Sequence, residues 1–441
     1  MVFSRLFFIY LFFPICFLCY FATKKTSYRN AVLIVFSLLF YACGDISFLW
    51  LVVASALVNF VLGRGIDKFR DKAPAKAFLA LGLVLNLGTL VGFKYTGFFI
   101  ENLNNWFSLS IPVPDLPLPL GISFFTFRTV SYLIDCAWGK VKAERNFFTF
   151  LLYVSFFPIT ISGPIGFGRI AVGLGKKVIL ADRLSGIVDQ FLGNDFTTQT
   201  TLGVWYGVIL YALQMYFDFS GYSDMAIGIA RIFGFHLDEN FRHPFLCKDI
   251  TEFWQRWHIS LGTFFRDYLL YVPLFGKRRK IGGLLLVWFC TGLWHGASWN
   301  FVVWGLFHGV FLVLERMLPI EKFLRFRLIQ NIYALLVVMV GWVFFRAENL
   351  TAALDYLKRM FVPYKTDVYS AYLSNEFMMV AALGLVSCGF LTLIFDKLPV
   401  KTEYKFGFLR LVNPAWCAVI AYFSVLLLAS NTYNPFIYFR F

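Results

Sequence analysis

Seventeen consecutive residues in the N-terminal part of the chain carry no charge: Ile46-Ser-Phe-Leu-Trp-Leu-Val-Val-Ala-Ser-Ala-Leu-Val-Asn-Phe-Val-Leu62. An α-helix needs about 20 apolar residues to cross the hydrocarbon core of a bilayer, and about 17 is the lower end of the usual range. This run therefore predicts a membrane-spanning helix. Comparable runs recur along the whole chain.

The composition agrees with a membrane protein. Of 441 residues, 59% are hydrophobic, 15% are charged and 56 are Phe. Soluble domains carry about 25% charged residues, and a soluble chain this apolar would expose large aggregating patches. The eight Cys residues are scattered and show no disulfide framework.

The sequence predicts an all-α, polytopic bundle that forms a single domain over residues 1–441. We expect about 11 spans, drawn from segments 5–22, 31–43, 46–62, 77–97, 119–137, 147–165, 202–217, 282–299, 301–317, 329–346, 377–395 and 411–429. Segments 171–192 and 246–275 mix polar and apolar residues. Lipid cannot satisfy exposed backbone groups, so we expect re-entrant or tilted helices there, covered by protein or lining a cavity.

The connecting loops fall into two classes by charge. The net charge of +15 is concentrated in loops at 24–29, 64–76, 140–145, 176–183, 277–280, 316–327 and 401–410. Segments 101–118, 193–201, 363–376 and 430–436 are almost free of Lys and Arg. Basic loops beside membrane spans are cytoplasmic, which places both ends of the chain outside. No basic surface domain with interleaved aromatics occurs, so nucleic acid is not an expected partner.

Segment 101–118 contains Pro112, Pro114 and Pro117, and Pro119 follows it directly. Proline disrupts a helix interior and favours extended backbone. We therefore expect an extended external loop there.

Three of the five histidines lie in apolar or aromatic company: His258, His295 and His308. Ionisable residues inside a membrane are costly and usually functional. A histidine in an apolar site stays neutral, and it can then accept the proton of an attacking hydroxyl during acyl transfer. The alternative is a histidine that only hydrogen-bonds between helices. His295 differs slightly from the others, because Gly292 and Gly296 permit a close approach of backbone or substrate.

A second polar island lies in the run Tyr216-Phe-Asp-Phe-Ser-Gly-Tyr-Ser-Asp224. Its carboxylates and hydroxyls could orient substrate or a histidine, bind a cation, or form an interhelical hydrogen-bond network. Arg256 and Arg266 could hold an anionic donor through bidentate contacts or extend to the cytoplasmic interface. Neither a phosphate-binding Gly-x-x-x-x-Gly-Lys-Ser/Thr loop nor a His-Glu-x-x-His zinc motif occurs.

Nearly the whole chain resembles the membrane-bound O-acyltransferase family, in its branch of alginate O-acetyltransferase membrane subunits. The matching stretches include Gly173-Leu-Gly-Lys-Lys-Val178, the polar island and Asn240-Phe-Arg-His-Pro244. The strongest are Phe253-Trp-Gln-Arg-Trp-His-Ile-Ser-Leu261, Gly292-Leu-Trp-His-Gly296 and Phe436-Ile-Tyr-Phe-Arg-Phe441. The resemblance implies that His295 is the catalytic histidine and His258 a second functional histidine. It also implies a ring of tilted helices around a thin central funnel.

A further set of residues is expected to bind substrate or support the histidines. We expect these to be Trp294, Asn300, Asp218, Ser220, Tyr222, Asp224, Trp254, Gln255 and Arg256. One departure concerns the junction near residues 165–173, where the family usually has a few tens of residues between Ser162-Gly-Pro-Ile165 and the Gly173 motif. Here Gly166-Phe-Gly-Arg-Ile-Ala-Val172 separates them, an apparent short deletion beside the donor entrance.

We therefore expect a multi-pass protein of the bacterial inner membrane that transfers acetyl toward hydroxyls of an extracytoplasmic polysaccharide such as alginate, cellulose or peptidoglycan. The resemblance implies acetyl-CoA as the cytoplasmic donor, no permanently bound cofactor or metal, and a separate extracytoplasmic acetyltransferase as partner. Two alternatives stay open at this point: D-alanyl transfer to teichoic acid, and a non-catalytic transporter or channel. A transporter would be expected to contain inverted repeats, which this sequence does not show.

Overall fold

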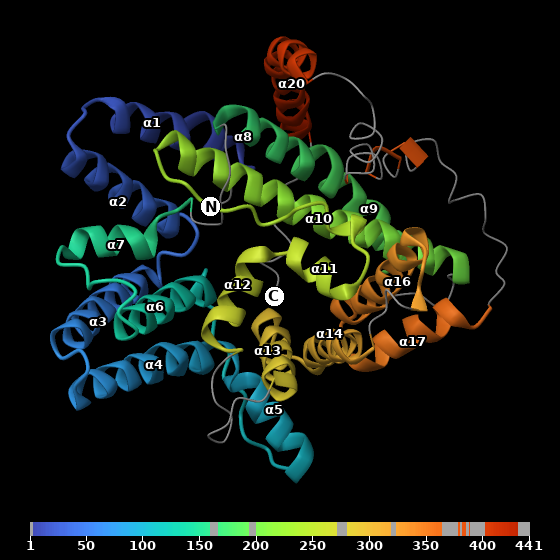
Figure 1. Ribbon diagram of the computed structural model, residues 1–441, viewed down its shortest axis with the longest axis horizontal. Helices are drawn as coiled ribbons and strands as arrows, with labels where there is room; N and C mark the ends of the chain where they lie inside the picture. Colours follow the sequence, from blue (N-terminus) through green and yellow to red (C-terminus); the bar gives the residue numbers. More distant parts are fainter. Residues whose placement is uncertain are drawn as a thin grey trace. The chain divides into compact units, whose positions relative to one another are not determined.

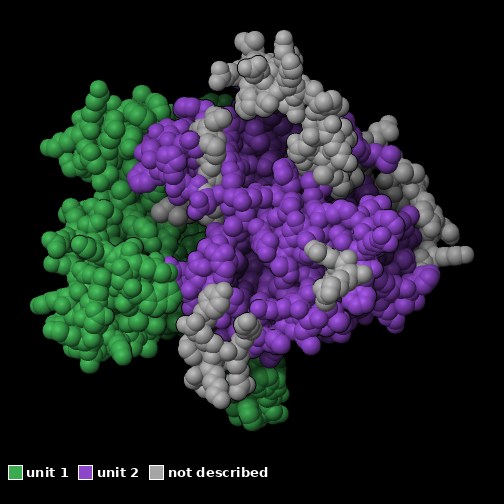
Figure 2. Space-filling model, viewed as in Figure 1, with its two compact units in different colours: residues 1, 7–157 green, residues 2–6, 158–441 purple. Residues whose placement is uncertain are grey.

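A computed structural model describes residues 3–158, 166–193, 200–270, 280–318, 323–363, 378–379, 382–384, 388 and 402–430. Within these ranges the regular elements are helices, and none is a strand. The chain divides into two compact units (Figure 2), one of residues 7–157 and one of residues 158–441 together with 2–6. Each unit is described by itself, and the single domain over 1–441 stays a prediction.

The N-terminal unit consists of helices of 5–22 residues (Figure 1). They are η1 (Phe8–Phe12, with π-helical geometry), α1 (Phe13–Phe21), α2 (Thr26–Ala42), α3 (Leu49–Lys68), α4 (Ala73–Lys94), α5 (Thr96–Phe107), α6 (Ile122–Ala137) and α7 (Phe147–Ser155). Helix α7 begins where the Asn146 side chain accepts hydrogen bonds from the Phe148 and Thr149 amides. Such a cap satisfies amides that have no partner inside the helix.

A neutral polar cluster joins α3, α4 and α6. The side-chain amides of Asn59 and Asn86 hydrogen-bond each other reciprocally at 3.0 and 2.7 Å, and the Thr129 hydroxyl donates to Asn86 at 2.8 Å. All three side chains are buried. Amide and hydroxyl groups hydrogen-bonded across apolar helices are a common means of holding membrane helices together.

The expected extended loop at 101–118 is partly wrong. Helix α5 continues to Phe107, and residues 109–118 then run without helix. The prolines begin only at Pro112, so nothing in 101–107 opposes a helix. The Asn104 side chain closes the turn by bonding the backbone N–H and C=O of Ile111 at 2.9 and 2.8 Å.

The C-terminal unit holds a second set of helices. They are α8 (Gly166–Gly175), η2 (Lys176–Ala181), α9 (Asp182–Phe191), α10 (Thr201–Ile232), η4 (Pro244–Leu246), α11 (Ile250–Arg256), α12 (Ile259–Tyr268), α13 (Lys280–His295), α14 (Trp299–Met317), α16 (Arg327–Arg346), α17 (Leu350–Phe361) and α20 (Thr402–Ser430). Helices α8, η2 and α9 follow one another directly and pack along α10 (Figure 1). Gly173 and Gly221 allow this, because a Cβ on either would lie within 2.7 Å of a carbonyl oxygen of the other helix.

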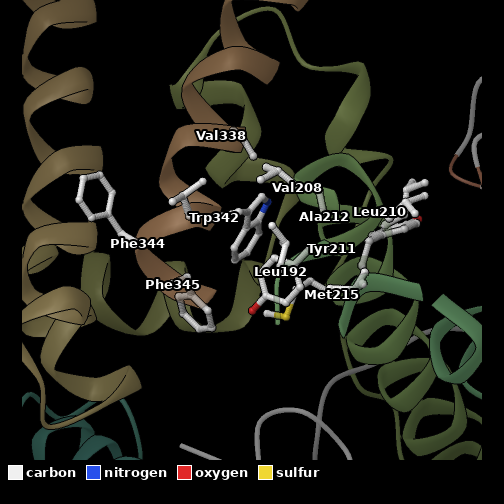
Figure 3. Close-up of a cluster of buried hydrophobic side chains, with 14 of the residues drawn as sticks. Leu192, Val208, Leu210, Tyr211, Ala212, Met215, Val338, Trp342, Phe344 and Phe345 are labelled. Carbon is white, nitrogen blue, oxygen red and sulfur yellow. The ribbon is translucent and has the colours of Figure 1, made fainter. Parts of the chain in front are cut away.

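Helix α10 is the most buried element of this unit. It has 32 residues, begins where Thr200 accepts from the Gly203 amide, and is buried over most of its length. At 1.5 Å per residue it is about 48 Å long, which exceeds the hydrocarbon thickness of about 30 Å. Figure 3 shows its packing against α16, where the rings of Tyr211 and Trp342 meet edge-on with centroids 6.3 Å apart.

Four of the described helices are long and apolar enough to cross a membrane: α3, α4, α14 and α16. Other expected spans appear as shorter apolar helices, among them α1, α2 and α13. Most of segment 377–395 lies outside the described residues, as do 277–279, 364–376 and 431–436. The all-helical membrane architecture is confirmed, and the number of spans stays a prediction.

The two mixed segments differ from each other. Segment 171–192 is almost entirely one helical run through α8, η2 and α9, whereas the described part of 246–275 contains the short helices α11 and α12. The assignment of Lys176 and Lys177 to a basic loop is wrong, whereas the expectation of helix in segment 171–192 agrees with the structure. Both lie in η2, and Lys177 is only 4% exposed. Each is paired with a carboxylate of α10, which explains why a cation is tolerated there.

Candidate active site

His258 occupies the turn between α11 and α12. Its backbone is left-handed, with φ 47° and ψ 52°, a region that non-glycine residues seldom adopt. Its side chain is 4% exposed, and the edge of the imidazole meets Phe219 of α10 with ring centroids 4.6 Å apart. The turn therefore presents the imidazole to the interior of the C-terminal unit.

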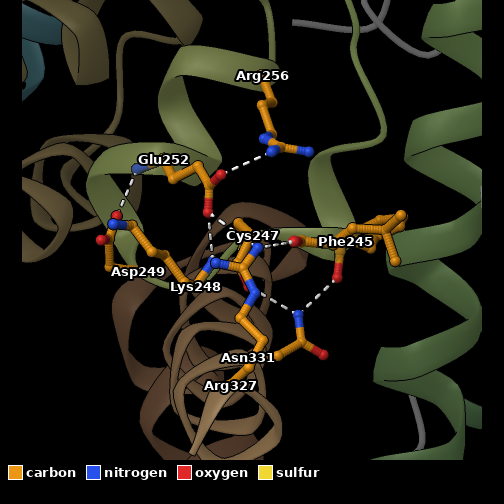
Figure 4. A network of polar contacts seen from close by, with 9 residues as sticks. Phe245, Cys247, Lys248, Asp249, Glu252, Arg256, Arg327 and Asn331 are labelled. Atoms are coloured by element: carbon orange, nitrogen blue, oxygen red, sulfur yellow. Dashed lines mark hydrogen bonds and ion pairs between the residues drawn. The ribbon is translucent and has the colours of Figure 1, made fainter. Parts of the chain in front are cut away.

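A polar network fixes the helix that precedes this turn (Figure 4). Glu252 accepts from the Lys248 amide and from Arg256, each at 2.6 Å, while Asp249 caps α11 by accepting from the Glu252 amide. Asn331 of α16 donates to the carbonyls of Phe245 and Cys247, both at 2.8 Å, and thus anchors the chain just before α11.

The network decides where the Arg256 guanidinium lies. Arg256 pairs with Glu252 one helical turn earlier, and its side chain is 31% exposed. The neighbouring Gln255 is exposed as well. Neither lines the pocket described below.

His295 ends α13, and its ring is buried among aromatic side chains. Its centroid lies 4.7 Å from Trp294, 4.8 Å from Trp304 and 5.0 Å from Phe345. The Trp294 ring also lies 5.7 Å from His258. Trp294 therefore contacts both histidines that the sequence singles out, although they are 37 residues apart along the chain.

The glycines beside His295 bring helices together. A Cβ on Gly292 would lie 2.4 Å from the Phe301 carbonyl oxygen, and one on Gly305 would lie 2.2 Å from that of Trp288. A Cβ on Gly296 would overlap the Phe301 ring. Gly292 and Gly296 were expected to permit a close approach of either backbone or substrate. In the structure they permit close packing of the α13 backbone on α14.

His308 and Trp254 form a neighbouring aromatic group. The His308 centroid lies 5.0 Å from Trp254, 5.3 Å from Trp304 and 5.7 Å from Trp288. Trp254 thus stands beside His308. Asn300 connects two helices. Its amide donates to the backbone carbonyls of Phe344 and Ala347 at 3.3 and 2.8 Å and so joins α14 to α16.

The polar island of α10 divides into three environments. Asp218 pairs with Lys177 at 2.8 Å, and Lys177 also pairs with Asp182 at 2.8 Å. Tyr222 stacks on Phe3 with ring centroids 4.9 Å apart.

The third environment, around Asp224, is the most polar. Asp224 accepts from Arg169 and Lys176, both at 2.7 Å, and Arg169 also binds both carboxylate oxygens of Glu239. Four charged side chains from α8, η2, α10 and the loop after α10 therefore meet at one place.

A pocket of about 640 Å³ opens beside these charges. It is lined by Gly168, Arg169, Val172, Lys176, Tyr216, Ser220, Ser223, Asp224, Ile227, Glu239, Asn240, Phe241, Arg242, His243 and Cys417. The Ser220 hydroxyl oxygen is buried in the pocket lining and has no hydrogen-bond partner among the described residues. Such a group is costly unless something bonds it, so the pocket is suited to a polar ligand.

Asn240 connects the pocket with His258. Its side chain is 1% exposed, its amide donates to Ser223 at 3.4 Å, and its carbonyl oxygen lies 3.3 Å from His258 Nδ1. The same oxygen accepts from the amide and the hydroxyl of Ser260, at 3.2 and 3.1 Å. A ligand in the pocket would thus be one side chain away from His258.

The sequence reasoning did not single out Arg169, Lys176, Glu239 and Asn240 as site residues. A usable signal existed for Lys176 and Lys177, because cations beside an apolar run need partners and two carboxylates occur in the apolar run of α10. No comparable signal existed for Arg169 or Glu239, whose contact is a product of the fold.

The C-terminal unit contains the region that matches a known protein family. The family model of the membrane-bound O-acyltransferases matches residues 164–354, which include both candidate histidines and much of the pocket. The probable alginate O-acetylase AlgI of Azotobacter vinelandii is 40% identical over 393 residues, covering 82% of this chain and 78% of the relative. This chain belongs to the membrane-bound O-acyltransferase family.

Two further relatives extend the comparison. The probable alginate O-acetylase AlgI of Pseudomonas putida is 35% identical over 492 aligned positions, which cover all of both chains. The peptidoglycan O-acetyltransferase of Helicobacter pylori is 34% identical over 426 residues, covering 82% of this chain and 80% of the relative. The alignment with the P. putida protein exceeds the 441 residues of this chain by 51 positions, so that relative has segments that this member of the membrane-bound O-acyltransferase family lacks.

The family assignment makes the chain an enzyme, an O-acyltransferase, and a multi-pass membrane protein. The roles of the individual histidines stay predictions. The structure adds that His258 and His295 contact the same tryptophan, whereas His308 does not contact it among the ring pairs described.

Proposed function

We propose that this protein transfers an acetyl group from a cytoplasmic thioester to hydroxyls of an extracytoplasmic polysaccharide, with His295 as the base and His258 in a supporting role. The observation that carries the proposal is the contact of both buried histidines with Trp294, beside a pocket that contains buried charges. Aromatic surroundings exclude water, which would otherwise hydrolyse the thioester.

The reaction needs one base at the reacting oxygen. The hydroxyl oxygen of the acceptor forms a bond to the thioester carbonyl carbon, while His295 takes the hydroxyl proton. The carbon–sulfur bond then breaks, and the leaving sulfur takes that proton from the imidazolium. The products are an acetyl ester and a free thiol, and His295 returns to its neutral form.

The pocket suits an anionic donor. Arg169, Lys176 and Arg242 give it three cations against the carboxylates of Asp224 and Glu239. Guanidinium groups bind phosphate oxygens through paired hydrogen bonds. We infer that the donor carries phosphate groups, as acetyl-CoA does.

The acceptor is inferred from the family. The relatives are named for alginate and for peptidoglycan, both polymers with free hydroxyl groups. We propose that the protein lies in the bacterial inner membrane, that its helices surround a thin funnel, and that it works with a separate extracytoplasmic acetyltransferase. The funnel would let donor and acceptor approach His295 from opposite sides.

The test uses membranes from a host that makes an acetylatable polysaccharide and has lost its own acyltransferase. With [¹⁴C]acetyl-CoA we expect ester-linked label in the polymer only when this chain is present. Arg242→Gln should raise the KM for acetyl-CoA roughly 10-fold, the effect of losing one hydrogen bond to a charged group. Arg266→Gln is the matched control, because Arg266 lies outside the pocket lining and its side chain is 58% exposed.

Two results would contradict the proposal. Label that enters the polymer only from a D-alanyl carrier protein would indicate D-alanyl transfer. Passage of a solute across the membrane without any new ester would indicate a transporter.

A further inference from the structure

We propose that Asn240 is a positioning residue that fixes the hydrogen of neutral His258 on Nδ1. The inference extends the proposed function, and the catalytic consequence of the tautomer rests on that function. The tautomer itself can be observed without any enzymatic reaction.

The orientation of the Asn240 amide follows from its neighbours. One side-chain atom of Asn240 lies 3.2 Å from the backbone nitrogen of Ser260, whose N–H can only donate. That atom must accept, so it is the oxygen Oδ1. The amide nitrogen then donates to Ser223 at 3.4 Å, across the pocket lining.

The tautomer of His258 follows from that oxygen. Oδ1 of Asn240 lies 3.3 Å from His258 Nδ1, and an amide oxygen has no hydrogen to give. If Nδ1 carried no hydrogen, its lone pair would face a lone pair of Asn240 Oδ1. If Nδ1 is protonated, it donates a hydrogen bond to that oxygen. The Ser260 hydroxyl fits the second case, because it donates to Oδ1 at 3.1 Å and leaves its oxygen, 3.2 Å from Nδ1, free to accept.

The backbone prevents the ring from escaping this arrangement. The Ile259 amide donates to the Asn240 carbonyl at 3.0 Å, and the Arg242 amide donates to the Arg256 carbonyl at 2.9 Å. These two bonds hold the loop after α10 against the turn that carries His258. The left-handed backbone of His258 is retained because the surrounding contacts specify it.

The assignment defines what His258 can do. With its hydrogen on Nδ1, neutral His258 presents a lone pair at Nε2. It can accept a hydrogen bond from an N–H or O–H group of a substrate, and it cannot donate one to a developing oxyanion. Of the two auxiliary roles that could be assigned to His258, orientation of substrate and oxyanion stabilisation, the geometry points to orientation.

The test is nitrogen NMR of the full chain in lipid bilayers with ¹⁵N-labelled histidine rings. Protonated and bare ring nitrogens have well-separated shifts, and His258→Gln identifies the signals of His258. We expect a protonated Nδ1 and a bare Nε2 in the parent. Asn240→Ala should give a mixture or the other tautomer, and Asn240→Asp, which keeps an oxygen in place, should restore a protonated Nδ1.

Asn300→Ala is the matched control. Asn300 is buried like Asn240, but its side chain accepts from the Ser298 hydroxyl and donates to the backbone carbonyls of Phe344 and Ala347, so its loss should leave the His258 signals unchanged. Acetylation should fall roughly 10- to 100-fold in Asn240→Ala, the range for groups that orient a histidine from behind. A protonated Nε2 in the parent, or unchanged signals in Asn240→Ala, would overturn the inference. Absence of acetylation by the parent, with the expected signals present, would overturn only the proposed function.

Discussion

The two units of this protein bury different kinds of polar group. In the N-terminal unit, helices are joined by the neutral cluster of Asn59, Asn86 and Thr129, and no charged side chain is buried in its described part. The C-terminal unit buries Lys177, Asp218 and Asp224, in addition to its histidines. Neutral amides are sufficient to hold helices together, whereas charges at membrane depth are costly and usually functional. The comparison therefore places the chemistry in the C-terminal unit.

The largest effect is expected at His295. His295→Gln keeps a polar side chain of similar length but removes the base, which should lower acetylation by about 10²–10⁴-fold. Polymer acetylation is measured in membranes that hold equal amounts of each variant. His258→Ala should lose less activity or raise the KM. His236→Gln is the control, since His236 is exposed, and acetylation by His295→Gln at the parental rate would remove the catalytic assignment.

The next effect concerns the buried ion pair. Lys177→Met leaves the carboxylates of Asp218 and Asp182 without their cation, and breaking a buried pair costs about 3–5 kcal/mol. Unfolding by denaturant in detergent micelles measures the loss. The double variant Lys177→Met with Asp218→Asn should recover part of it, because the uncompensated charge is gone. A single variant as stable as the parent would mean that the pair is not formed.

A smaller effect is expected in the N-terminal unit. Asn86→Leu removes the bonds to Asn59 and Thr129, and interhelical hydrogen bonds in membranes contribute roughly 1–2 kcal/mol at most. The same unfolding assay should register that loss, while acetylation per folded molecule stays at the parental level. A large fall in specific activity would break the comparison, because it would assign chemistry to the N-terminal unit.

The smallest effect is expected at the start of α7. Asn146→Ala removes the side chain that caps the Phe148 and Thr149 amides, and loss of such a cap costs about 1 kcal/mol. The unfolding midpoint should shift slightly, with no change in acetylation. Arg145→Ala next to it is a suitable control, since its side chain makes no cap bond to α7.

The sequence predicted well what depends on composition and short-range pattern. The uncharged run at 46–62 became part of α3, and Ile329 to Arg346 became most of α16. The prediction of an extended loop over 101–118 was partly wrong. The prolines of this segment lie only in its second half, so they do not determine the backbone of residues 101–107. The first half of α10 was visible as the apolar segment 202–217, but its 32-residue length was not, because Asp218 and Asp224 interrupt the hydrophobic run.

The candidate site was predictable only in part. Aromatic surroundings pointed equally to His258, His295 and His308, and the family resemblance then selected His258 and His295. Asp224 could be selected from its place in a polar island. Their partners could not be selected, since Arg169 bonds Asp224 and Glu239 only through the packing of three separate segments. Nothing local in the sequence indicates that Asn240 faces His258, because the contact depends on two backbone hydrogen bonds between distant turns.

The most direct test of the central claim compares two buried histidines of the C-terminal unit in a sided assay. The parent, His295→Gln and His308→Gln are reconstituted into proteoliposomes at equal folded amounts, with labelled acetyl-CoA on the cytoplasmic face and a hydroxyl acceptor on the other. His308 is 1% exposed and shares Trp304 with His295, but no described ring pair joins it to Trp294. The account predicts acetylated acceptor from the parent and from His308→Gln, and none above background from His295→Gln. Acetylation by His295→Gln together with its loss in His308→Gln would contradict it.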